Sequence, residues 1–235
     1  MLRSYAWFLR SLNLVLEYPL VIRKFLDPFR LLKKDEQERM EQRARRKPLI
    51  VVGLQNPGPK YRGTRHNVGA MCVDELARRS GARLENRVRE TELAETEIGD
   101  ALAVIAKPIT FVNDSGKSVR QILRKFNANP QSLLLVVDDM DLTIGRLRLR
   151  AGGSSGGHNG LKSVRQVTGT DDFPRLRIGV GRPPTGSDPI QHVLGRFRPD
   201  ERDQIEAGIS RAADAVEAIQ RDGLDRAMER FNRPG

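Results

Sequence analysis

Blocks of apolar positions alternate with polar turns along most of this 235-residue chain. Short β-branched runs predict strands, and stretches in which apolar residues recur every three or four positions predict helices. The predicted strands are 49–54, 101–108, 132–139, 146–152 and 175–181, and the predicted helices are 68–80, 115–126, 157–167, 201–220 and a short one after Gly223. This alternation is typical of a three-layer α/β fold, with a mainly parallel, twisted sheet flanked by helices.

The first 47 residues do not follow this pattern. Residues 1–29 mix leucines with scattered arginines, and residues 33–47 form a charged run without an apolar stripe. We therefore predict a single catalytic domain at 48–235 and a basic N-terminal extension at 1–47, helical or disordered. Three roles remain open for it: organelle targeting by residues 1–30, a place on a membrane surface, or none, including a start codon assigned too early.

The charge balance points to a polyanionic partner. The 41 basic and 30 acidic residues give a net charge of +11, which favours a nucleic acid or an anionic membrane surface. Residues 1–47 hold 12 of the basic and six of the acidic residues, so any nucleic-acid site in the body must be a local patch. The single cysteine excludes an intrachain disulfide framework. No apolar run reaches the ~20 residues that a bilayer span needs.

Four polar turns follow or flank the predicted strands, at 56–67, 110–116, 138–141 and 152–160. In open α/β sheets, ligands bind at the carboxyl edge of the strands, so we expect these turns to converge there. They carry Asn56, His66, Asn67, Asn113, Asp138, His158 and Asn159. The fourth turn, GGSSGGHNG, matches neither a phosphate-binding loop nor a dinucleotide fingerprint. We expect it to form a wall of a cleft and predict no nucleotide cofactor.

His66 is the strongest candidate for a general base. A neutral imidazole takes a proton from water near pH 7, and a carboxylate on its other nitrogen fixes the tautomer. Asp138, at the end of an apolar strand, can supply that carboxylate. No GxSxG motif is present and Cys72 falls inside a helix pattern, so a base-activated water is the simplest hydrolytic design. Alternatively, His66 only forms a hydrogen bond within its loop.

Several of these segments resemble the bacterial-type peptidyl-tRNA hydrolase family, in order and at matching separations. They are GLQNPGPKYRGTRHNVG (53–69), KPITFVNDSG (107–116), DDMDLTIGRLRLR (138–150), GGSSGGHNGLKS (152–163), FPRLRIGVGRP (173–183) and VLGRF (193–197). The resemblance covers roughly residues 48–230. It implies a monomeric α/β enzyme that hydrolyses the ester between peptide and tRNA during translation. It further implies action in the cytoplasm without a cofactor, a metal or a stable protein partner.

The resemblance also implies roles for particular residues. His66 corresponds to the catalytic base and Asp138 to its partner. Asn56, Asn113 and Asn159 correspond to residues that hold the peptide and the water, and amide side chains suit this because they donate and accept at once. Tyr61 matches a position beside the tRNA end. Arg150 and Arg177 match positions that contact a tRNA phosphate, and Arg148 on the same alternating strand extends the patch.

Two departures from the family pattern lie near these residues. Gln55 stands where glycine is common, and Val112 stands where methionine is usual, which predicts a slightly looser pocket. Two rival functions remain. One is an RNA-binding protein that keeps the scaffold without hydrolysis, like a plant chloroplast relative that assists intron splicing. The other is a membrane-surface protein acting through residues 1–30.

Overall fold

The computed structural model describes residues 48–99 and 101–233, and the predicted extension at 1–47 lies outside them. Its centre is a seven-stranded sheet in the order β2-β3-β4-β1-β5-β7-β6. The strands are β1 (Leu49–Gly53), β2 (Asn86–Arg87), β3 (Thr91–Ile98), β4 (Ala101–Pro108), β5 (Leu133–Asp139), β6 (Leu147–Arg150) and β7 (Arg175–Gly179). The four central strands are parallel, and the outer strands β2, β3 and β6 are antiparallel to their neighbours.

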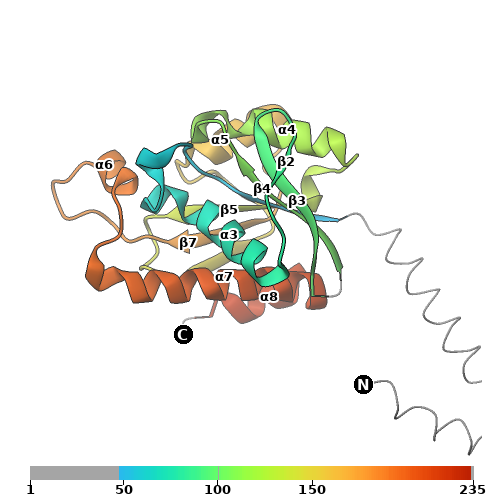
Figure 1. The fold of residues 1–235 in the computed structure, drawn as a ribbon. Coiled ribbons are helices and arrows are strands. Elements are labelled where there is room, and N and C mark those ends of the chain that lie inside the picture. Colours follow the sequence, from blue (N-terminus) through green and yellow to red (C-terminus); the bar gives the residue numbers. More distant parts are fainter. Residues whose placement is uncertain (1–47, 100, 234–235) are drawn as a thin grey trace, which may run out of the picture. The chain divides into compact units, whose positions relative to one another are not determined.

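Helices cover both faces of the sheet (Figure 1). The sheet is covered by α3 (Val68–Ser80), α4 (Ser115–Lys125), α5 (Asn159–Thr168), α7 (Arg202–Asp222) and α8 (Leu224–Phe231), while the short helix α6 (Pro189–Leu194) lies to one side of it. Single 3-10 turns are η2 (Pro59–Tyr61), η3 (Arg65–Asn67), η4 (Val112–Asp114), η5 (Pro130–Ser132) and η6 (Pro199–Glu201). One apolar core lies between the sheet and α3, α7 and α8, and the other lies under α4 and α5. The predicted three-layer α/β fold is therefore confirmed.

The central strand β5 shows why the sheet needs helices on both faces. All seven of its residues are buried. Leu134 and Val136 point into the core on the α3 side, while Leu133, Leu135 and Val137 point into the other core. A strand that is buried on both faces reads as a continuous apolar run, which is the pattern that the sequence shows at this point.

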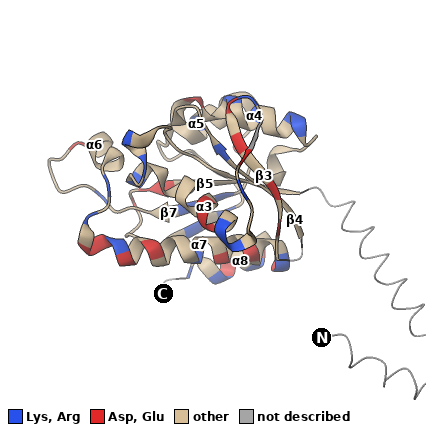
Figure 2. Cartoon of the chain, in the orientation of Figure 1, with Lys and Arg blue, Asp and Glu red and all other residues tan. Residues whose placement is uncertain are grey.

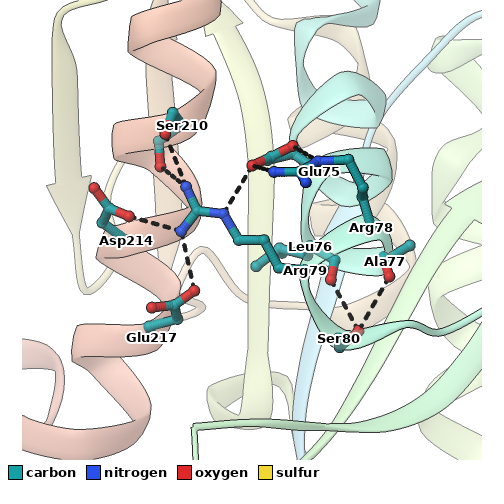
Figure 3. A network of polar contacts seen from close by, with 9 residues as sticks. All are labelled: Glu75, Leu76, Ala77, Arg78, Arg79, Ser80, Ser210, Asp214 and Glu217. Atoms are coloured by element: carbon teal, nitrogen blue, oxygen red, sulfur yellow. Dashed lines mark hydrogen bonds and ion pairs between the residues drawn. The ribbon is translucent and has the colours of Figure 1, made fainter.

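A network of ion pairs fastens α3 to α7 (Figure 3). The Arg79 guanidinium contacts Glu75 on its own helix at 2.8 Å. Across the interface it contacts Asp214 at 2.7 Å and Glu217 at 3.0 Å, and it donates to the main-chain and side-chain oxygens of Ser210. All five of its N–H donors are therefore used, and these contacts fix the position of α3 against α7.

The sequence pattern did not predict the strands β2 and β3 or the short helix α6. The strand β3 has the sequence TELAETEI, in which three glutamates obscure the apolar pattern because much of one face of the strand meets solvent. The short helix α6 begins at Pro189 behind Asp188, whose side chain accepts a hydrogen bond from the Ile190 N–H at 2.9 Å. Within the described residues, no helix combines the length and the apolar character that a membrane span requires.

Candidate active site

The four polar turns meet at one cavity of about 520 Å³. The turns after β1, β4 and β5 converge because these three strands are parallel neighbours with their carboxyl ends at one edge. The fourth turn leads into α5 and lines the same cavity through Gly156, Gly157, His158 and Asn159. The cavity is lined by six of the eight predicted site residues: Asn56, His66, Asn113, Asp138, Asn159 and Arg177.

A close approach of α3 to the sheet places His66. His66 lies in η3, directly before α3. A Cβ atom on Gly69, in the first turn of α3, would overlap the main-chain oxygen of Val136 on β5. Glycine therefore lets the start of α3 rest on β5, which brings His66 over the end of that strand, where Asp138 lies.

His66 and Asp138 form a short, largely buried pair. The distance from His66 Nδ1 to Asp138 Oδ1 is 2.6 Å, and the two side chains are 12% and 6% exposed. Burial lowers the pKa of His66, but the hydrogen bond and the charge of Asp138 outweigh it, so the pKa is raised above the ordinary value. For Asp138, burial raises the pKa, but hydrogen bonds from both histidines hold it well below its usual range. Asp138 is therefore ionised and accepts from His66.

His158 is a second partner of the same carboxylate oxygen. As the N-cap of α5, its Nδ1 accepts hydrogen bonds from the main-chain N–H groups of Gly160 at 3.1 Å and Leu161 at 3.3 Å. Its proton must therefore lie on Nε2, which donates to Asp138 Oδ1 at 3.1 Å. Two donors fix the carboxylate, and His66 keeps its own proton on Nδ1. The remaining nitrogen of His66, Nε2, makes no hydrogen bond to any residue that the structure describes, so its lone pair can accept a proton.

The same three side chains form the one described group that could hold a metal ion. Ligand atoms of His66, Asp138 and His158 lie within 4.8 Å of one another. A metal on His158 would need the lone pair of Nε2, but this nitrogen carries the proton because Nδ1 accepts from the amides of α5. Only two ligands remain, so the arrangement fits a hydrogen-bonded relay better than a metal centre.

Asn56 is held so that only its amide N–H groups are free. Its Oδ1 accepts a hydrogen bond from the Val112 N–H at 3.0 Å. The main-chain N–H of Asn56 donates to Asn67 Oδ1 at 2.8 Å, and Asn67 Nδ2 donates to the main-chain oxygen of Asn56 at 2.9 Å. In contrast, Asn113 and Asn159 are exposed at the cavity, and their side chains make no hydrogen bond within the described part of the chain. Both amides are therefore free to donate and to accept.

Tyr61 and Arg150 lie outside this cavity. The Tyr61 ring packs edge-on against Phe111, which lines the cavity, with ring centroids 6.1 Å apart. Arg150 is exposed on β6 and lines an adjoining cavity of about 390 Å³ that also includes Arg148 and Arg177. The two predicted phosphate contacts therefore share a cavity beside the main one.

Arg177 and its neighbour Arg175 hold the glycine-rich loop. Arg177 pairs with Asp139 at 3.2 Å and donates to the main-chain oxygens of Ser154 and Ser155. Arg175 is 1% exposed, and its guanidinium donates to the main-chain oxygens of Gly153 and Ser154 in the loop and to those of Asp171 and Phe173 in the turn before β7. Register pairs Arg148 with Arg177 and Arg150 with Arg175 across β6 and β7. Arg177 thus uses most of its donors, whereas Arg150 makes no hydrogen bond or ion pair with the part of the chain that the structure describes.

Sequence reasoning missed the apolar side of the cavity. This wall is lined by Phe111, Val112, Met140, Pro189, Ile190, Val193 and Leu194. Four of these residues belong to α6, and the Asp-Pro start of that helix was the available signal. Cys72 behaves as expected: burial raises the pKa of its thiol to about 12, so it is no nucleophile.

Fold and cavity together define an α/β protein with a histidine–aspartate site at the carboxyl edge of its sheet. A sequence model described as peptidyl-tRNA hydrolase matches residues 50–235, and the chain belongs to this family. The peptidyl-tRNA hydrolase of Halalkalibacterium halodurans is 45% identical over 183 residues, 78% of this chain and 99% of that protein. That of Synechococcus sp. strain JA-3-3Ab is 48% identical over 185 residues, 78% and 82% of the two chains.

The comparison with solved structures agrees. The crystal structure of peptidyl-tRNA hydrolase from Acinetobacter baumannii has a TM-score of 0.74 and 32% identity, over 79% of this chain and 95% of that chain. The predicted resemblance is thus confirmed for the body of the chain, from residue 50 to the end.

Proposed function

We propose that His66 activates the water that cleaves peptidyl-tRNA, with Asp138 and His158 holding its ring in the productive tautomer. As a member of its family, the chain is a hydrolase of the peptidyl-tRNA ester, and it releases the peptide and the free tRNA. The observation that carries the assignment is the 2.6 Å contact between His66 Nδ1 and Asp138 Oδ1 inside the cavity.

The proposed reaction needs one base and no covalent bond between the substrate and the enzyme. His66 Nε2 takes a proton from water as the water oxygen bonds to the ester carbonyl carbon. The resulting imidazolium is stabilised by the ionised carboxylate of Asp138. When the tetrahedral intermediate collapses, the bond to the ribose oxygen breaks, and His66 returns its proton to that oxygen. The base is then neutral again.

The three asparagines can bind a peptide by hydrogen bonds that do not depend on its sequence. Asn56 offers only donors, because its oxygen is taken by Val112, so it suits a carbonyl oxygen of the substrate. Asn113 and Asn159 can bind either a carbonyl or an N–H group, and one of them can orient the water. Hydrogen bonds to main-chain groups are common to every peptide, which fits an enzyme that must accept any nascent chain.

Arg150 and Arg177 supply the proposed phosphate contacts, and Tyr61 lies beside the tRNA end. Arginine binds phosphate bidentately without reading bases, as an enzyme that serves many tRNAs requires. We place the enzyme in the cytoplasm as a monomer that uses no metal and no stable protein partner. Residues 1–47 are proposed as a separate extension of the catalytic domain at 48–235.

A labelled-water experiment tests the chemistry. Single turnover of peptidyl-tRNA by an excess of the full chain in H₂¹⁸O should give a peptide whose new carboxyl carries one ¹⁸O atom. If ¹⁸O appeared in Asp138 instead, that carboxylate would be a nucleophile and the base mechanism would be wrong. RNA binding without any peptide release would favour the non-hydrolytic rival.

A further inference from the structure

A basic groove lies apart from the active-site cavity and shares no lining residue with it. It has a volume of about 370 Å³ and lies between the β5–β6 turn, α7 and α8. Three arginines line it: Arg146 from the turn, Arg211 from α7, and Arg233 from the segment that follows α8. All three are exposed, and none makes an ion pair within residues 48–99 and 101–233.

The α7 face of this groove carries no acid. It consists of Gln204, Ala207, Gly208 and Arg211, which recur at the spacing of one helix face. The helix as a whole is mixed in charge (Figure 2), but its acidic residues are Asp203, Glu206, Asp214, Glu217 and Asp222, and none of them lines the groove. Three like charges converge here with no carboxylate among the described residues that line the groove, and they create a local field that attracts an anion.

The floor of the groove is fixed by a contact between two glycines. A Cβ atom on Gly208 would overlap Gly145, and a Cβ on Gly145 would come too close to the main-chain oxygen of Gln204. Gly145 also has a φ of 73°, which glycine adopts without strain. The turn therefore rests directly on α7, and Arg146, the next residue, is held at the edge of the groove.

We propose that this groove binds the phosphodiester backbone of the tRNA at a distance from its acceptor end. Arg146, Arg148 and Arg150 alternate along one strand direction, so a basic row runs from the groove to the cavity that contains Arg150. The row spans about 13 Å at the usual rise per strand residue. A chain of repeating phosphates can contact both ends of such a row, whereas one small anion cannot. This rests on the proposed function in taking tRNA as the ligand.

The test uses the full chain and deacylated tRNA. The triple variant Arg146→Gln, Arg211→Gln, Arg233→Gln is compared with a matched triple variant Arg78→Gln, Arg83→Gln, Arg221→Gln. The control loses the same charge from exposed arginines that are already paired with Glu75, Glu85 and Asp222. Kd is measured from 50 to 200 mM salt, and folding is checked by thermal melting.

Each lost phosphate contact should lower the log–log salt slope by about 0.7–0.9. The rise in Kd over this salt range should therefore be about 25-fold smaller for the groove variant than for wild type, and nearly unchanged for the control. Equal slopes for the two variants would overturn the proposal. So would a groove variant that bound tRNA normally but lost binding to polyglutamate, since the partner would then be an acidic protein segment.

A short peptidyl ester that lacks the tRNA body separates this inference from the proposed function. The groove variant should cleave that ester at the wild-type rate. Failure of the wild-type chain to cleave it at all would count against the proposed chemistry and not against the groove. Loss of its cleavage in the groove variant alone would mean that these arginines support the fold of the active site, which would also overturn the proposal.

Discussion

The Nε2–H of His158 donates a 3.1 Å hydrogen bond to Oδ1 of Asp138, the same oxygen that lies 2.6 Å from the catalytic candidate His66. The main-chain amides at the start of α5 enforce this direction because they occupy the other nitrogen of His158. The helix end thus orients the carboxylate, and the carboxylate orients the proposed base. His158 is a positioning residue in this scheme.

Replacement of His158 separates its two roles. Asparagine is a good N-cap, so His158→Asn should keep α5 intact while removing the bond to Asp138. We expect kcat to fall on the order of 10-fold, because the carboxylate loses one of its two anchors. With one donor fewer, Asp138 should interact more strongly with protonated His66, and the acidic limb of kcat/KM should move to higher pH. An unchanged pH profile would show that His158 acts only on helix stability.

The pH dependence of the wild type follows from the same pair. Protonated His66 cannot accept a proton from water, so kcat/KM should fall as pH drops through the pKa of that residue. Asp138 raises this pKa, so the limb should lie above the ordinary value for histidine. Asp138→Asn removes the charge and leaves burial, which should move the limb to lower pH and reduce kcat. A pH–rate profile of both proteins checks the sign, and a limb that moved upward in Asp138→Asn would contradict it.

Asn113 and Asn56 should respond differently to removal of the side chain. Asn113 is exposed and makes no hydrogen bond among the described residues, so Asn113→Ala should leave the melting temperature unchanged. It should weaken substrate binding by about 1–3 kcal/mol, seen as a higher KM. Asn56→Ala strands the buried N–H of Val112 as well, and should destabilise the fold by about 1–3 kcal/mol. Equal melting temperatures for the two variants would count against this distinction.

The two proposed phosphate ligands should also differ. Arg150 makes no hydrogen bond or ion pair among the described residues, so Arg150→Ala should raise KM for peptidyl-tRNA. It should also lower the slope of log affinity against log salt concentration by about 0.7–0.9 and leave cleavage of a short ester unchanged. Arg177 also pairs with Asp139 and holds the glycine-rich loop. Arg177→Ala should therefore lower cleavage of the short ester as well. If both variants cleaved that ester like wild type, the loop would not depend on Arg177.

The sequence predicted the strands that carry the site and the pairing of His66 with Asp138. Both follow from local pattern, because apolar runs identify central strands and polar residues after them share one edge. The part played by His158 could not be predicted, since its tautomer depends on main-chain amides that only the folded helix places. Likewise, the sequence could not show that the hydrogen-bond donors of Arg177 are taken, because their partners are Asp139 and a loop 22 residues away in sequence. The glutamates of β3 hid that strand because its apolar face is visible only in the sheet.

The most direct test of the central claim is turnover of peptidyl-tRNA by His66→Ala, with His192→Gln as the matched control. His192 lies on α6 and bonds the main-chain oxygen of Gly181, outside the cavity lining, so its variant should retain activity. We expect His66→Ala to lose about 10²–10⁴-fold in kcat, the usual contribution of a general base, with tRNA affinity nearly unchanged. Turnover by His66→Ala close to the wild-type rate would contradict the account.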